Sequence, residues 1–114
     1  MNNRALMIAT LVGIVVQVAM VMIGHTNPTV KTFFAIGGMG FSLIAGLLYG
    51  IIAGGGAIGS LAIGGAFAGG ICAFIGILVS HLLGDVPATL LLLGTISSVV
   101  TGAIGGAVAK FFVR

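Results

Sequence analysis

The chain has 114 residues, of which 60% are hydrophobic and 4% are charged, and its mean hydropathy of +1.39 is far above that of water-soluble domains. This composition indicates an integral membrane protein and excludes a soluble catalytic or nucleic-acid-binding domain. The net charge of +3 arises from four cations and one acid, so charge is scarce and no basic surface for nucleic acid is implied.

The apolar stretches divide the chain into four expected membrane spans, since a spanning helix needs about 20 apolar residues. The first ends at a polar segment in which Asn27-Pro28 predicts a turn. The next uncharged stretch is too long for one span, so we expect a reversal at Gly54-Gly55-Gly56. One all-α membrane domain, residues 1–114, with two helical hairpins is predicted. Its expected spans are residues 5–24, 32–53, 57–83 and 89–109.

The few charged residues predict the orientation of these spans. With four spans both termini share a side, and that side carries three of the four cations: Arg4, Lys110 and Arg114. The positive-inside rule then places both termini in the cytoplasm of a bacterial-type plasma membrane. Aromatic residues near this side are expected to lie at the membrane interface, namely Tyr49, Phe111 and Phe112.

Small residues recur at every fourth position in the last three spans. Residues four apart lie on nearly one side of a helix, so a neighbouring backbone can approach closely there. We predict small-xxx-small helix packing with the third span at its centre. The glycines assigned to it are Gly38, Gly46, Gly50, Gly64, Gly76, Gly94, Gly102 and Gly106. Two interpretations stay open, namely packing within one four-helix bundle and an interface in a homo-oligomer.

Polar residues within the spans are few and uncharged. The absence of a mid-depth ionisable group argues against proton-coupled exchange and ion pumping. Gln17 lies near the middle of the first span, and we expect it to hydrogen-bond across helices; lining a solute path is the alternative. Ser42, Ser60 and Ser98 are candidates for the same two roles, although such serines by default bond the backbone four residues earlier.

The side opposite the termini collects His25, Lys31, His81 and Asp85. If the third helix continued past its expected end, His81 and Asp85 would share a face and the carboxylate would orient the imidazole. The main expectation is that these are solvated loop residues. A pH-sensitive or gating role and a metal site of two histidines and one aspartate are the alternatives.

No catalytic set, cofactor fingerprint or metal cluster is assigned, and an enzyme is not expected. The glycine-rich stretches lie within spans and lack the Lys-Ser/Thr of a phosphate-binding loop. The predicted function is an oligomeric transport or permeation subunit for a neutral or lipid-like small molecule. A non-transporting accessory subunit of a membrane complex is the alternative, and a pore former is a third. The expected partners are the lipid bilayer and either further copies or another membrane protein.

Overall fold

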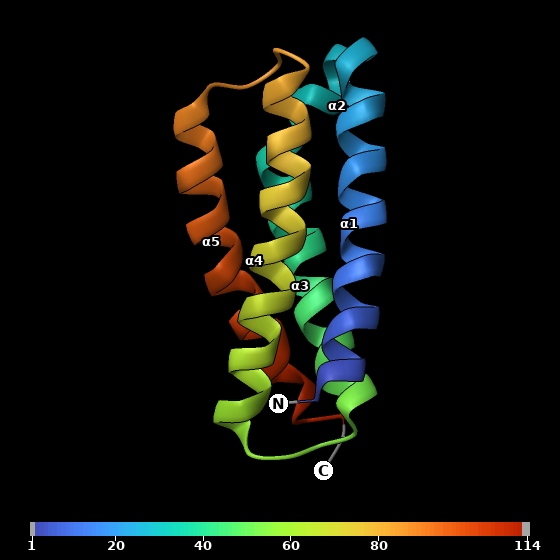
Figure 1. The fold of residues 1–114 in the computed structure, drawn as a ribbon, viewed down its shortest axis with the longest axis vertical. Coiled ribbons are helices and arrows are strands. Elements are labelled where there is room, and N and C mark those ends of the chain that lie inside the picture. Colours follow the sequence, from blue (N-terminus) through green and yellow to red (C-terminus); the bar gives the residue numbers. More distant parts are fainter. Residues whose placement is uncertain (1, 113–114) are drawn as a thin grey trace.

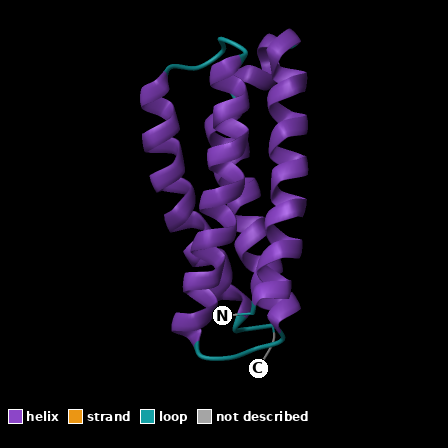
Figure 2. Cartoon of the chain, viewed as in Figure 1, coloured by secondary structure: helices purple, strands orange, loops and turns teal. Residues whose placement is uncertain are grey.

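The computed structural model describes residues 2–112, and every regular element within them is a helix (Figure 2). Four of the helices are long and apolar enough to cross a membrane. The longest dimension is 42 Å, close to the full thickness of a bilayer with its headgroup regions. The elements are α1 (Asn3–Thr26), α2 (Pro28–Thr32), α3 (Phe34–Ala53), α4 (Ile58–Leu82) and α5 (Ala88–Ala109).

The helices form a bundle in which α3 and α4 lie between α1 and α5 (Figure 1). Both α3 and α4 contact each of the other long helices, whereas α1 and α5 make no contact within residues 2–112. The start of α1 and the end of α5 lie at one end of the bundle, together with the α3–α4 connection (Figure 1). The α1–α3 and α4–α5 connections lie at the other end, which we call the loop end. The cytoplasmic location of the termini stays a prediction.

The turn expected at Asn27-Pro28 contains a short helix, α2, that the sequence analysis did not predict. The Asn27 side chain accepts hydrogen bonds from the backbone N–H groups of Thr29 and Val30, at 3.0 and 3.3 Å. Pro28 occupies the first helical turn, where its missing N–H costs nothing. A local cap therefore converts this loop into one helical turn.

The reversal between α3 and α4 occurs where the sequence predicts it. Gly54, Gly55 and Gly56 all have positive φ values, of 78°, 115° and 128°, a conformation that residues with a Cβ rarely adopt. The Gly54 N–H closes α3 by bonding the carbonyl groups of Gly50 and Ile51. The chain thus turns within four residues, before α4 begins at Ile58.

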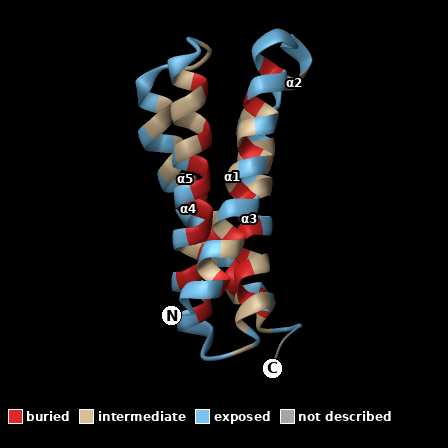
Figure 3. Ribbon diagram, turned by 45° about the vertical axis from the view of Figure 1, so that its right-hand side comes forward, coloured by how far each residue is buried: buried red, intermediate tan, exposed pale blue. Residues whose placement is uncertain are grey.

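Buried residues line the inward sides of the helices (Figure 3), and at several positions two backbones face each other. A methyl group added at Gly46 of α3 would overlap the Gly102 carbonyl of α5. One added at Gly69 of α4 would lie 2.8 Å from the Gly102 Cα and from the Ser98 carbonyl oxygen. Helix α5 therefore approaches α3 and α4 at distances that leave no room for a side chain.

The location expected for Tyr49 is wrong. Its ring is 2% exposed and lies over Gly64, where an added methyl group would overlap it. Its hydroxyl accepts a hydrogen bond of 3.1 Å from the backbone N–H of Asn2. Since Gly64 leaves space for the ring, Tyr49 belongs to the core and not to an interfacial belt. Phe111 and Phe112, in contrast, are exposed.

Candidate binding cavity

A cavity of about 150 Å³ lies among all four long helices in the half of the bundle nearest the loop end. Each long helix contributes to its wall, and Val86 of the α4–α5 loop lines it as well. No charged side chain lines this cavity, and its walls are mainly apolar. Its polar side chains are those of Gln17, Ser80, Ser97 and Ser98. Such a combination of apolar walls and a few polar groups is typical of small-molecule sites.

Gln17 lies at the inner end of this cavity and joins α1 to α3. Its Nε2 donates to the Gly38 carbonyl oxygen at 3.1 Å and to Ser42 Oγ at 3.2 Å. The Cys72 thiol of α4 lies 3.7 Å from the same nitrogen. Gln17 is buried, so these bonds satisfy the NH2 group of an amide that would otherwise be costly in hydrocarbon. The residue therefore both bonds across helices and lines the cavity, and its role in lining a solute path stays a prediction.

Ser42 sits beside this amide and bonds within its own helix. Its Oγ lies 2.9 Å from the Gly38 carbonyl oxygen and 3.3 Å from that of Gly69 on α4, and its one proton serves one of them at a time. The first contact is the backbone bond four residues earlier that helical serines favour. A polar cluster of Gln17, Ser42 and Cys72 therefore links α1, α3 and α4.

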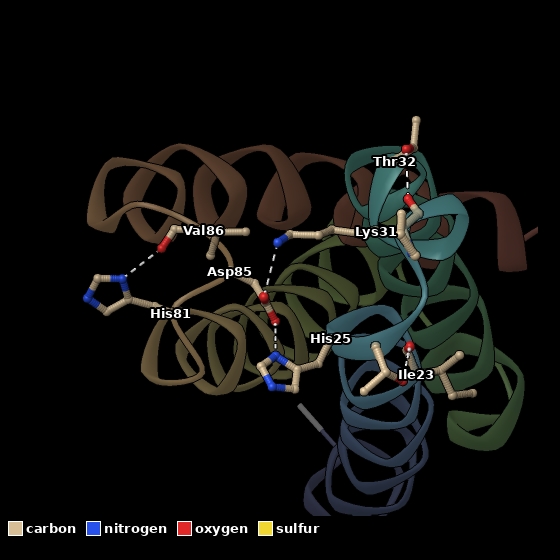
Figure 4. Close-up of polar contacts among 9 residues, drawn as sticks. Ile23, His25, Lys31, Thr32, His81, Asp85 and Val86 are labelled. Carbon is tan, nitrogen blue, oxygen red and sulfur yellow. Dashed lines mark hydrogen bonds and ion pairs between the residues drawn. The ribbon is translucent and has the colours of Figure 1, made fainter.

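Asp85 contacts two of the predicted loop-end residues, His25 and Lys31 (Figure 4). His25 Nδ1 lies 2.8 Å from Asp85 Oδ2, and Lys31 Nζ donates to Asp85 Oδ1 at 3.0 Å. These contacts, that with His25 foremost, hold the pKa of the Asp85 carboxyl below its usual value. Val86 follows directly and lines the cavity, so this ion-paired cluster fixes the loop that borders it.

The alternative in which His81 and Asp85 share a helical face is not found in the structure. Helix α4 ends at Leu82, and Gly84 adopts a positive φ of 81° that turns the chain. The two residues therefore do not share a helical face. His81 Nδ1 instead lies 2.9 Å from the Val86 carbonyl oxygen (Figure 4). Within residues 2–112 no three His, Cys, Asp or Glu side chains are grouped as metal ligands would be.

Some of the other predicted residues border the cavity, and the rest lie elsewhere in the bundle. Ser98 lines the cavity, and Gly38 and Gly94 lie in its wall. Gly76 packs against Gln17, whose Cβ would lie 2.9 Å from an added methyl group. Ser60 is exposed in the first turn of α4 and belongs to neither the cavity nor the polar cluster. The remaining glycines of the set pack in the other half of the bundle: Gly46, Gly50, Gly64, Gly102 and Gly106.

Ser80 and Val86 are among the cavity residues that were not singled out from the sequence. Ser80 is buried and its hydroxyl has no hydrogen-bond partner within residues 2–112. The sequence feature that could have indicated Ser80 is its position one turn after Gly76, on the same stripe of small residues. No sequence feature indicates Val86, because its contact with the cavity depends on how Asp85 holds the α4–α5 loop.

Comparison of the chain with models of known protein families, with curated proteins and with solved structures gave no match.

Proposed function

We propose that this four-span membrane protein is a transport or permeation subunit that takes a small, neutral, weakly polar or lipid-like molecule into the loop-end cavity. The observation that supports the proposal is a cavity of about 150 Å³ bounded by all four apolar helices. A cavity of this volume holds a molecule of roughly the size of benzene.

The chemistry of the walls supports a neutral ligand. None of the side chains lining the cavity is charged, so an ion would lose its hydration without gaining a counter-charge. The serines and Gln17 supply hydrogen bonds at a few positions while apolar side chains supply the remaining surface. A molecule with one or two polar groups on an apolar body matches this wall.

In this proposal the glycine stripes serve to pack the helices of one bundle closely. Support comes from the positions at which an added methyl group would overlap a neighbouring helix, as at Gly46, Gly65 and Gly106. The expected homo-oligomer stays a prediction. Its test is the native mass of the protein purified in mild detergent, where a defined multiple of the 11.2 kDa chain is expected.

Solute flux into proteoliposomes tests the permeation function. Osmotic swelling is followed for a series of small neutral solutes that carry one or two polar groups on an apolar body, such as short diols. The wild type is expected to accelerate swelling for at least one solute over protein-free liposomes. Ser97→Leu, which places a larger side chain in the cavity, should return the swelling rate to background. Ser60→Leu, at an exposed position of α4, is the matched control and should leave the rate unchanged. Equal background rates for all three proteins would contradict permeation.

A non-transporting accessory subunit is the second candidate, and the outer face of α1 favours it. Met7, Leu11 and Val15 are exposed at four-residue spacing and form one apolar stripe that no other helix of residues 2–112 covers. A partner membrane protein packed on this stripe would co-purify in a fixed ratio. The decisive comparison is between wild type and Leu11→Ser: loss of a stoichiometric partner would support this function over transport.

A further inference from the structure

We propose that the cavity binds a lipid-soluble alcohol, which enters sideways from the bilayer between α3 and α5 and places its hydroxyl between Gln17 and Ser80. This inference rests on the proposed use of the cavity as a binding site and adds the route of entry and the class of ligand.

The route follows from which walls of the cavity are exposed. Met39 of α3 and Leu93 of α5 line the cavity and are 41% and 61% exposed. On the opposite wall, Val21 of α1 and Ala73 of α4 are buried. The cavity is therefore closed on the α1–α4 side and open between α3 and α5. Both rim residues are apolar and lie within spanning helices, so a molecule dissolved in the lipid meets this opening directly.

The first polar group offered to the ligand is the amide oxygen of Gln17. Nε2 faces the Gly38 carbonyl oxygen, to which it donates. A flipped amide would put Oε1 against this carbonyl, which has no proton to give, so the orientation is determined. No hydrogen bond reaches Oε1 from any residue of the described range 2–112. Gln17 thus presents an acceptor without a donor at the inner end of the cavity.

The second polar group is the hydroxyl of Ser80. Its Oγ is buried without a hydrogen-bond partner in residues 2–112, although Ser42 in a similar helical setting bonds its own backbone. Ser80 lies one helical turn, about 6 Å along the axis, from Gly76, against which Gln17 packs. Buried polar groups are ordinarily paired, and Ser80 lines the same cavity as Gln17, with its Oγ covered while the cavity is empty.

An alcohol hydroxyl satisfies both groups at once, because it donates one hydrogen bond and accepts another. It can donate to Gln17 Oε1 and, once the Ser80 side chain rotates about χ1 to turn its covered Oγ into the cavity, accept from Ser80 Oγ. A hydrocarbon would leave both groups unpaired, and a charged headgroup would find no counter-charge in the wall. The apolar body of the alcohol then fills the cavity, and a longer tail extends between Met39 and Leu93 into the lipid.

Photolabelling tests this inference with the full chain in lipid vesicles. The probe is an eight-carbon alcohol that carries a diazirine, and labelled residues are mapped by mass spectrometry. Labelling is expected to saturate at Met39 and Leu93. At Val15, which is exposed on α1 away from the cavity, labelling should rise in proportion to the probe concentration. Unlabelled octanol should displace the saturable labelling about tenfold more strongly than octane at equal membrane concentration, the effect of about one hydrogen bond.

The variant Ser80→Ala examines the hydroxyl contact and Ser60→Ala is its control. Ser80→Ala is expected to keep saturable labelling but to lose most of the preference for octanol, with an unchanged elution profile that shows an intact fold. Equal displacement by octane and octanol in the wild type would overturn the assignment of an alcohol, while the binding site itself would stand. Labelling that never saturates at Met39 and Leu93 would overturn both. The swelling assay separately decides whether bound molecules cross the membrane.

Discussion

His25 and Asp85 are 60 residues apart in the chain, yet His25 Nδ1 and Asp85 Oδ2 are 2.8 Å apart. This contact joins the end of α1 to the loop between α4 and α5. Lys31 adds a second bond from α2 to the same carboxylate, and the Asp85 side chain is only 7% exposed. One carboxylate therefore connects the two hairpins at the loop end, where α1 and α5 themselves make no contact.

Asp85 should titrate below the usual aspartate value of 3.8, because its partners stabilise the carboxylate. The chain has one acidic side chain, so a single carboxyl signal from ¹³C-labelled aspartate reports it directly by NMR. His25→Ala should raise this pKa toward 3.8 more than Lys31→Ala does. Because the pKa is lowered on folding, the stabilisation is complete above about pH 3.8 and is lost as the pH falls through the lowered pKa. A midpoint at or above 3.8 in the wild type would contradict the ion-paired cluster.

Two glycines of α3 should respond oppositely to alanine. Gly46→Ala places a methyl group on the Gly102 carbonyl of α5 and should destabilise the protein by about 1–3 kcal/mol, the usual cost of overpacking. Gly40 has nothing within 4 Å of an added methyl group, so Gly40→Ala should be neutral or stabilise by up to about 1 kcal/mol through helix propensity. Denaturation in mixed detergent micelles measures both. Similar values for the two variants would show that α3 and α5 do not approach closely.

Glycine-to-leucine substitutions on α4 should also disrupt the protein at crowded positions and leave it unchanged at open ones. Gly64→Leu collides with the Tyr49 ring and Gly76→Leu with Gln17, and both are expected to misfold or to elute as broad aggregates in mild detergent. Gly59→Leu lies on the same helix with open space around it and should elute like the wild type, as should the volume-conserving Leu91→Ile. Native profiles for both collision variants would mean that α4 is not the packing centre.

Gln17→Leu should weaken the bundle modestly. The substitution removes the bonds to Gly38 and Ser42, but the Gly38 carbonyl keeps its bond from Ser42. A loss of about 1 kcal/mol or less is expected, the typical value of a polar contact between membrane helices. Thermal denaturation in detergent measures it, and Gln17→Glu is an informative companion, since an ionisable group there should cost more. An unfolded Gln17→Leu protein would mean that the amide is essential to assembly.

The topology predicts opposite locations for the two ends of the bundle. Reporter fusions after Arg114 should read as cytoplasmic, because three of the four cations lie near the termini. Reporters inserted at Asn27 should read as external. Two reporters on one side would be incompatible with four spans.

The four long apolar helices could be predicted from the sequence, and the structure confirms them. The reversal at Gly54 could also be predicted, because hydrophobic length and glycine runs act locally along the chain. The hydrogen-bond and packing partners of individual side chains could not be predicted, because they depend on how each helix is rotated about its axis. Gln17 was expected to bond across helices, yet nothing in the sequence indicates Gly38 as its acceptor. Asp85 pairs with His25 and not with His81 because one glycine, Gly84, ends the helical geometry on which the expectation depended.

The close approach of α5 to the two middle helices has a consequence for biosynthesis. Because α5 follows the other three long helices along the chain, the ribosome releases it after them. The glycine-lined groove of α3 and α4 around Gly46 and Gly69 must therefore first face lipid. That groove fits a helix backbone and no bulky side chain, so lipid tails pack poorly in it. An α5 from a neighbouring nascent copy would fit it as well as the chain's own. Crowded synthesis should therefore favour helix exchange between copies as the characteristic assembly error.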